Sequence, residues 1–170
     1  MGRRKRNDGE SKTCAIICGG IYAAIGFIIR IRVNNPFEML HILGGSNYFP
    51  PLWVFNLLCI CWMFLSGCAA GRLIRLVWSG RVCGREEVSA YSGGLFFIAL
   101  FFLTLLWYPL FFGAGSIALC ALISLLCVAA SAMCALSWRR ADFLCCIIMA
   151  ANSVWLIYIL LANLSVLLSA

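Results

Sequence analysis

Charged residues are scarce in this chain of 170 residues. They make up 11% of the sequence, whereas 64% of the residues are hydrophobic and the mean hydropathy is +1.01. Soluble domains carry about 25% charged residues, and a soluble protein of this length could not bury so much apolar surface. A lipid bilayer can accept that surface. The composition therefore excludes a soluble protein and predicts an integral, multi-pass membrane protein with no separate aqueous domain.

Metal ligands other than cysteine are also scarce. The chain has a single histidine, His41, and no loop pair of cysteines with the spacing of a zinc site. Ten of the eleven cysteines lie inside apolar runs, where they resemble small apolar side chains more than a disulfide framework. We therefore expect neither a metal site nor a cofactor.

The long apolar segments lack charged residues at their centres. A charge in the membrane is costly and is kept where ion pumps, proton relays or voltage sensors need it. The pattern argues against a proton-coupled transporter and against a voltage sensor. The net charge of +7 is explained by membrane topology, so no nucleic-acid partner is expected.

Five segments are long enough to cross a bilayer, which takes about 20 apolar residues. The sequence predicts an all-α fold in which a basic cytoplasmic tail, 1–13, precedes a single transmembrane domain, 14–170. The predicted helices span about 14–29, 51–77, 94–112, 115–138 and 143–168.

Five crossings put the N-terminal tail, the 79–94 loop and the 139–142 turn on one side of the membrane. That side then holds eleven of the thirteen Lys and Arg residues. Because basic residues accumulate on the cytoplasmic side, the N-terminus is predicted to be cytoplasmic. A bacterial plasma membrane is the default location, and an organelle membrane is an alternative.

Small residues mark the second and fourth predicted helices. Gly67 and Gly71 form a G-x-x-x-G pair, and the fourth helix carries a stripe of small residues at alternating four- and three-residue spacing. The stripe consists of Cys120, Ser124, Cys127, Ser131 and Cys134. Small residues let helices approach closely. The pattern fits packing within one chain or the face of a homodimer.

Polar residues in the fifth predicted helix point to a shared face. Asn152 and Asn163 are eleven residues apart, with Trp155 and Tyr158 between them. An amide in hydrocarbon needs a partner, so both amides should point into the bundle. They can serve helix–helix hydrogen bonding or line a ligand pocket with aromatic walls and a few polar groups.

The third predicted helix offers a matching face. Thr104, Trp107 and Phe111 recur at i, i+3 and i+7. The 30–50 segment is a long connection for a compact bundle, and such loops are often lids. A plain tether on the membrane surface explains it equally well.

Three stretches resemble one known family. Pro-Pro-Leu-Trp-Val-Phe at 50–55, followed by Gly67 and Ala69–Ala70, is similar to a P-P-x-W-V-F…G-x-A-A second helix. Trp-Tyr-Pro-Leu-Phe-Phe-Gly at 107–113 is similar to a W-x-P-L-F-F-G motif, and Trp155, Tyr158 and Asn163 are similar to a W-x-x-[FY]-x-x-x-x-N pattern. The chain thus resembles the TspO/MBR family, the translocator proteins.

Four positions depart from the family pattern. Cys59 stands where the family usually has a tryptophan, Met63 where it has a tyrosine, Thr104 where it has an asparagine, and Ala151 where it has a proline.

The resemblance implies a five-helix bundle, often dimeric, with a pocket that the first loop closes. It also implies binding of porphyrins, sterols or synthetic benzodiazepine-site compounds. Some bacterial members have been linked to light-dependent porphyrin breakdown through two pocket tryptophans. Trp155 matches one of them, and Cys59 occupies the other position.

We therefore expect a membrane receptor or carrier for a flat hydrophobic ligand such as a porphyrin or a sterol-like molecule. Aromatic rings would supply stacking surface and a few polar side chains would fix orientation. The expected ligand-binding residues are Trp53, Thr104, Trp107, Phe111, Asn152, Trp155, Tyr158 and Asn163.

Two other functions remain open on the sequence alone. One is an enzyme that modifies a bound tetrapyrrole, although we expect no catalytic residues. The other is a non-catalytic subunit that only packs with other membrane proteins. The expected partners are the lipid bilayer, the hydrophobic ligand and, if the small-residue faces are free, a second copy of the chain.

Overall fold

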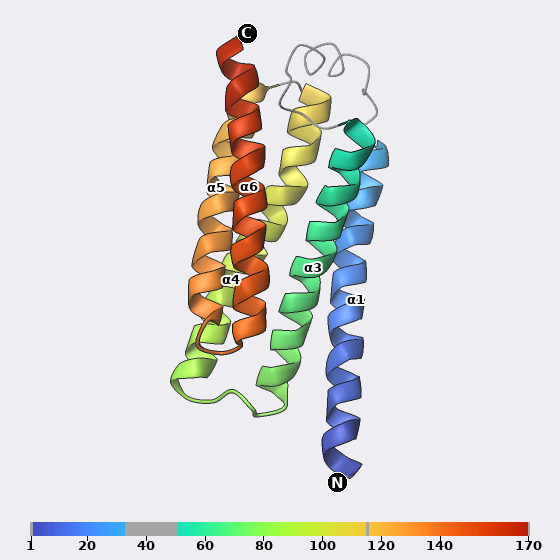
Figure 1. Cartoon of the computed structure of the whole chain (residues 1–170), viewed down its shortest axis with the longest axis vertical. Coiled ribbons are helices and arrows are strands. Elements are labelled where there is room, and N and C mark those ends of the chain that lie inside the picture. The colour runs from blue at the N-terminus through green and yellow to red at the C-terminus, as the bar shows by residue number, and fades with distance from the viewer. Residues whose placement is uncertain (1, 33–50, 115, 170) are drawn as a thin grey trace.

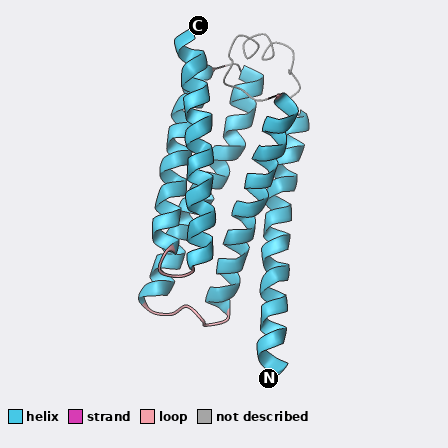
Figure 2. Cartoon of the chain, in the orientation of Figure 1, coloured by secondary structure: helices cyan, strands magenta, loops and turns pink. Residues whose placement is uncertain are grey.

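The computed structural model describes residues 2–32, 51–114 and 116–169, and all its regular structure is helical (Figures 1 and 2). The helices are α1 (Gly2–Arg32), α3 (Leu52–Trp78), α4 (Arg85–Pro109), the π-helical turn η1 (Leu110–Ala114), α5 (Ile117–Trp138) and α6 (Phe143–Ser169). Within these ranges, five helices are long and apolar enough to cross a membrane. The predicted all-α, five-span fold is confirmed.

Two helix starts differ from the sequence prediction by more than two residues. α1 begins at Gly2 instead of residue 14, because the basic segment before the span is rich in Arg and Lys, which favour helix. α4 begins at Arg85 instead of residue 94. Gly84, with φ +63°, ends the preceding turn, and Glu86 and Glu87 in the first turn interact favourably with the helix dipole.

The end of α4 also differs from the prediction of 112. The regular α-helix stops at Pro109 and continues as the wider turn η1. Proline has no N–H to donate and its ring crowds the carbonyl four residues earlier, so the normal helix is interrupted here. The 30–50 segment expected as a lid lies, from residue 33 on, outside the described residues.

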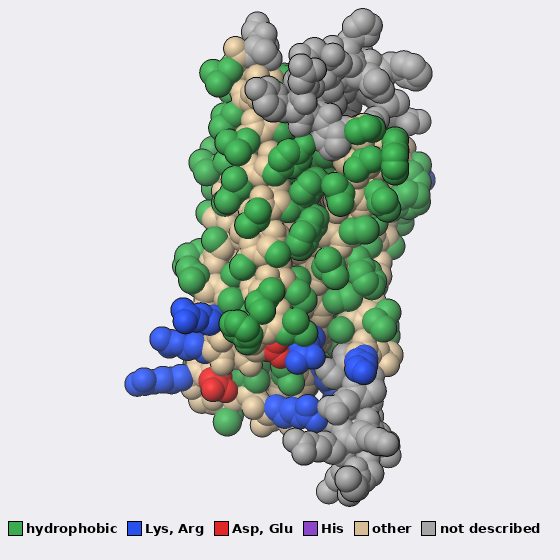
Figure 3. All heavy atoms as spheres, in the orientation of Figure 1, with side chains coloured by type: hydrophobic (Ala, Val, Ile, Leu, Met, Phe, Trp, Pro, Cys, Tyr) green, Lys and Arg blue, Asp and Glu red, His purple; other side chains and the backbone are tan. Residues whose placement is uncertain are grey.

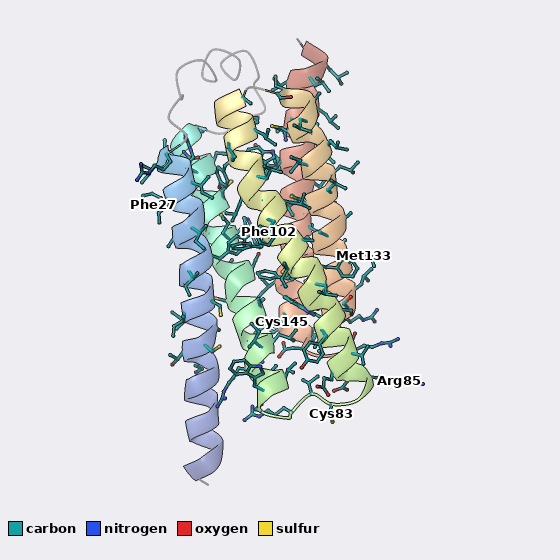
Figure 4. The ribbon with its side chains drawn as sticks, turned by 180° about the vertical axis from the view of Figure 1, so that it is seen from behind. Phe27, Cys83, Arg85, Phe102, Met133 and Cys145 are labelled. Atoms are coloured by element: carbon teal, nitrogen blue, oxygen red, sulfur yellow. The ribbon has the colours of Figure 1, made fainter. Side chains whose placement is uncertain are left out.

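The helices form a closed ring of neighbours. α1 packs most extensively on α3, α5 on α6 and α4 on α5, while α3 meets α6 and α1 touches α4 only lightly. The N-terminus and C-terminus lie at opposite ends of the bundle (Figure 1). Large side chains such as Phe27, Phe102 and Met133 point outward, whereas Cys145 lies between helices (Figure 4). The outer surface is therefore suited to lipid contact.

The G-x-x-x-G pair packs α3 against α1. An added Cβ at Gly67 would lie 2.8 Å from the carbonyl oxygen of Cys18, and one at Gly71 would lie 2.7 Å from that of Cys14. The small-residue stripe on α5 is buried along its whole length. Both patterns serve packing within one chain, so neither leaves a free face for a homodimer.

Basic residues gather at the end of the bundle where the N-terminus lies (Figure 3). At this end Arg72 on α3 donates to Asp142 over 2.9 Å, which ties α3 to the turn between α5 and α6. The other oxygen of Asp142 accepts from the backbone N–H groups of Leu144 and Cys145 and so caps α6. These basic residues are the ones from which the sequence predicts a cytoplasmic N-terminus, and that orientation stays a prediction.

Candidate functional site

A small cavity of about 40 Å³ lies inside the bundle, and every one of the five long helices contributes to its wall. We call it the inner cavity. It is lined by Tyr22, Cys59, Trp62, Met63, Ser66, Thr104, Trp107, Tyr108, Ser124, Cys127, Asn152, Trp155, Leu156 and Ile159. The lining is mostly aromatic and apolar, with a few hydroxyl groups and one amide, which is the usual chemistry of a small-molecule site.

Aromatic rings at the wall of the inner cavity and behind it pack in a continuous cluster. The ring of Phe55 lies 6.1 Å from that of Trp107 and 5.9 Å from that of Trp155. Trp107 stacks on Phe111 at 4.5 Å, and Trp155 stacks on Tyr158 at 5.3 Å. Phe55 on α3 therefore joins the aromatic rings of α4 to those of α6.

The two asparagines of α6 both point into the bundle, as expected. Asn152 donates its amide N–H to the hydroxyl of Ser131 over 3.1 Å. Asn163 donates to Ser124 over 2.8 Å and is fully buried. Each amide thus bonds α6 to α5, so helix–helix hydrogen bonding is part of their role.

The structure brings only some of the expected site residues to the inner cavity. Thr104, Trp107, Asn152 and Trp155 line it. Phe111 and Tyr158 lie behind the two tryptophans and support their rings, and Asn163 holds the lining residue Ser124 in place.

Trp53 is not brought to the cavity. It lies in the first turn of α3 and is 70% exposed, whereas Phe55, Cys59 and Met63 form the buried face of the same helix. The motif that contains Trp53 therefore contributes Phe55 to the aromatic cluster instead.

Most lining residues were not among the expected site residues, and two of them are instructive. Tyr22 reaches the cavity from α1, and Ser66 reaches it from α3. Each is a polar or aromatic residue inside an otherwise apolar span, and this was the available signal. Cys59 and Met63, noted above as departures from a family pattern, also line the cavity.

Tyr22 separates the inner cavity from a larger hollow between α1, α3 and α4. This groove has a volume of about 450 Å³ and is lined almost wholly by apolar side chains, among them Trp78, Phe97, Phe101 and Trp138. The ring of Tyr22 contacts those of Phe97 at 5.9 Å and Phe101 at 4.8 Å. Tyr22 lines both spaces, so it is a wall shared by the inner cavity and the groove.

The described residues include no cluster of three or more His, Cys, Asp or Glu side chains that could hold a metal ion. All eleven cysteines are free thiols. They pack as small side chains, and buried examples donate to backbone carbonyls, such as Cys145 to Ala69 over 3.3 Å.

Fold and cavity together define a class: a five-helix membrane protein with an aromatic-lined internal cavity. Within this class, the model of the TspO/MBR family matches residues 14–168, which is nearly the whole chain. The chain belongs to the TspO/MBR family. No curated protein and no solved structure matches it.

Proposed function

We propose that this protein binds a flat hydrophobic small molecule inside the helix bundle and acts as its membrane receptor or carrier. Membership of the TspO/MBR family supports a membrane ligand-binding protein in general. The observation that carries the specific proposal is the inner cavity, where Trp107 and Trp155 border a space with a few polar groups.

The inner cavity is too small for such a ligand as it stands. Its 40 Å³ compares with about 300–1,000 Å³ for ordinary ligand pockets. Tyr22 is the wall between this cavity and the 450 Å³ groove, so rotation of its ring would join the two. The joined space would have the size of an ordinary pocket and would open between α1 and α4, where the helices touch only lightly.

Binding would be driven by apolar burial and aromatic stacking, with Thr104 and Asn152 fixing orientation. A porphyrin or a sterol-like molecule fits this chemistry. Any transport would be passive, because no described lining residue is charged.

The test is titration of purified protein in lipid nanodiscs with protoporphyrin, followed by quenching of tryptophan fluorescence. The parent should show saturable quenching. Trp107→Leu and Trp155→Leu should each weaken affinity about tenfold, since each removes a stacking ring.

Trp53→Leu is the matched control, because it removes a tryptophan from the exposed first turn of α3. Its affinity should equal that of the parent. Equal weakening in all three variants would place the ligand outside the inner cavity. If the parent is folded but shows no saturable quenching, the protein is better explained as a subunit that packs with other membrane proteins and binds no ligand. The hydrogen bonds from Asn152 and Asn163 to α5 agree with that role too.

A further inference from the structure

A second, shallow pocket lies on the outside of the bundle, over α3 and between α1 and α6. Both of these helices pack on α3 but scarcely touch each other, so a space remains between them (Figure 1). Its volume is about 200 Å³. We call it the surface pocket. It shares no residue with the inner cavity or with the groove, so it is a separate feature of the molecule.

Small side chains keep the surface pocket open. Ala15 on α1 and Cys68 and Ala69 on α3 line it, and none of them is long enough to fill it. The helices around it are closely packed on α3. An added Cβ at Gly71 would lie 2.7 Å from an α1 carbonyl oxygen, and the Cys145 thiol of α6 donates to the carbonyl of Ala69 over 3.3 Å. The pocket is therefore bounded by well-packed helices.

Two cations face the surface pocket. Lys12 is exposed and makes no hydrogen bond or ion pair with the described residues. Within the same ranges, Arg72 bonds through its Nε alone, which donates to Asp142 over 2.9 Å, so its other N–H groups are left for an acceptor. The second oxygen of Asp142 caps α6. Two cations against one carboxylate leave the pocket positively charged.

The surface pocket lies where two of its helices pass from water into lipid. The apolar run of α1 begins after Lys12, and α6 begins at Phe143. Basic side chains gather at this end of the face shown in Figure 3. Its cations therefore lie at the depth of lipid phosphate groups, whereas Leu144 and Ile148 line it from the apolar start of α6.

An apolar strip leads from the surface pocket toward the middle of the membrane. Cys61, Leu65 and Cys68 recur at i, i+4 and i+7, so they lie on one face of α3. Cys68 lines the pocket, Leu65 is 41% exposed and Cys61 is exposed. The seven residues from Cys68 to Cys61 span about 10 Å of helix, which is enough to support part of an acyl chain.

We propose that the surface pocket binds an anionic phospholipid, with its phosphate on Lys12 and Arg72 and one acyl chain along the strip of α3. Basic pockets between membrane helices bind the head groups of such lipids. A soluble phosphate would gain the charge but not the apolar contact. A zwitterionic lipid would bring a further cation to a pocket that already has two. The proposal is independent of the proposed function, because no residue of the pocket lines the inner cavity.

Native mass spectrometry of the full chain in a neutral detergent tests the proposal. Titration with phosphatidylglycerol or phosphatidylcholine of identical acyl chains gives the Kd of the first bound lipid. The parent should bind phosphatidylglycerol about tenfold more tightly, and an excess of soluble glycerol phosphate should not displace it.

Two variants remove the cations one at a time. Lys12→Gln should weaken phosphatidylglycerol binding about fivefold and leave phosphatidylcholine binding nearly unchanged, whereas Lys12→Arg should keep both. Arg72→Gln should weaken phosphatidylglycerol binding by about tenfold or more, because it also leaves the carboxylate of Asp142 facing the lipid.

Arg85→Gln is the matched control for charge. Arg85 is exposed at the start of α4, points out of the bundle and does not line the surface pocket (Figure 4). Its affinity for phosphatidylglycerol should equal that of the parent.

Ala15→Leu tests the apolar part of the pocket without changing its charge. The larger side chain would occupy the space of the acyl chain and should weaken phosphatidylglycerol binding at least about fivefold. Thermal unfolding of each variant in the absence of added lipid checks that the fold is kept.

Each other outcome would overturn the proposal in a particular way. Equal affinity of the parent for the two lipids would show that the pocket does not recognise an anionic head group. Equal weakening by Lys12→Gln and Arg85→Gln would mean that the whole basic end attracts anionic lipid without a defined site. Displacement by glycerol phosphate, or full affinity in Ala15→Leu, would leave an anion site that holds no acyl chain. None of these results depends on whether protoporphyrin binds.

Discussion

Two buried tryptophans show how differently the two regions of the interior are built. Trp138 lies at the small-residue end of the bundle, defined here by Ala69, Gly93, Cys134, Trp138 and Cys145, and its ring also borders the groove. Its indole N–H donates to the carbonyl of Ala90 over 3.3 Å, and its ring stacks on Phe97.

Trp107 lies farther toward the C-terminal end, where its ring borders the inner cavity and stacks on Phe111. At the small-residue end, small side chains let helix backbones meet, and thiols donate to backbone carbonyls, as Cys134 does to Gly93 over 3.4 Å. At the inner cavity large aromatic rings meet instead. In lipid, packing rather than hydrophobic burial holds helices together, so we expect the small-residue end to supply stability and the cavity to supply recognition.

The largest expected effect tests this division directly. Trp138→Leu should lower the free energy of unfolding by about 3 kcal/mol, because its ring packs directly on Gly93 and the change leaves an unpaired carbonyl at Ala90. Trp107→Leu should cost about half as much, since Trp107 packs against other large rings that can move into the space it leaves. Unfolding of the two variants in mixed micelles measures the difference, and equal losses would remove the distinction between the regions.

A glycine pair sharpens the comparison at the α4–α5 contact. An added Cβ at Gly93 would lie 2.3 Å from the Trp138 ring, whereas one at Gly94 would meet nothing within 4 Å. Gly93→Ala should therefore destabilise by about 2 kcal/mol through overpacking. Gly94→Ala should be neutral or stabilising by up to about 1 kcal/mol, because alanine favours helix. The same unfolding assay measures the stability of both variants. No loss of stability in Gly93→Ala would show that α4 and α5 are loosely packed at this contact.

The smallest effect belongs to the ion pair at the end where the N-terminus lies. Asp142→Ala should cost about 1 kcal/mol, mostly from the lost cap of α6, since Arg72 is partly exposed and its pairing is screened. Asp142→Asn keeps a capping oxygen and should cost about half of that. If both variants lost the same amount, and the loss vanished in high salt, the ion pair rather than the cap would be the stabilising contact.

The membrane itself explains why the sequence predicted the helices better than the site. Length and hydropathy mark a span whatever surrounds it, so five helices were predicted correctly. In lipid, however, both faces of a helix are apolar, and hydrophobic periodicity does not tell the inside from the outside. Trp53 and Phe55 are equally plausible cavity residues in the sequence, yet one is exposed and the other is buried.

Polar residues were the better guide. Asn152 and Asn163 were expected inside the bundle because an amide in hydrocarbon needs a partner, and each has one. Thr104 was expected on the same helix face as Trp107, and it lines the cavity beside Trp107. Ser66 is also a hydroxyl inside an apolar span, but whether it faces the cavity depends on how α3 is rotated against the four other helices.

The sequence by itself determined the membrane environment, the five crossings and the family, because these follow from hydropathy, length and local motifs. Only the tertiary structure decided that the small-residue stripe is internal, that Tyr22 stands between the inner cavity and the groove, and that Ser66 rather than Trp53 faces the cavity. These features depend on the rotation and register of helices against each other. Such choices are set by side-chain packing across the whole bundle, which no single segment encodes.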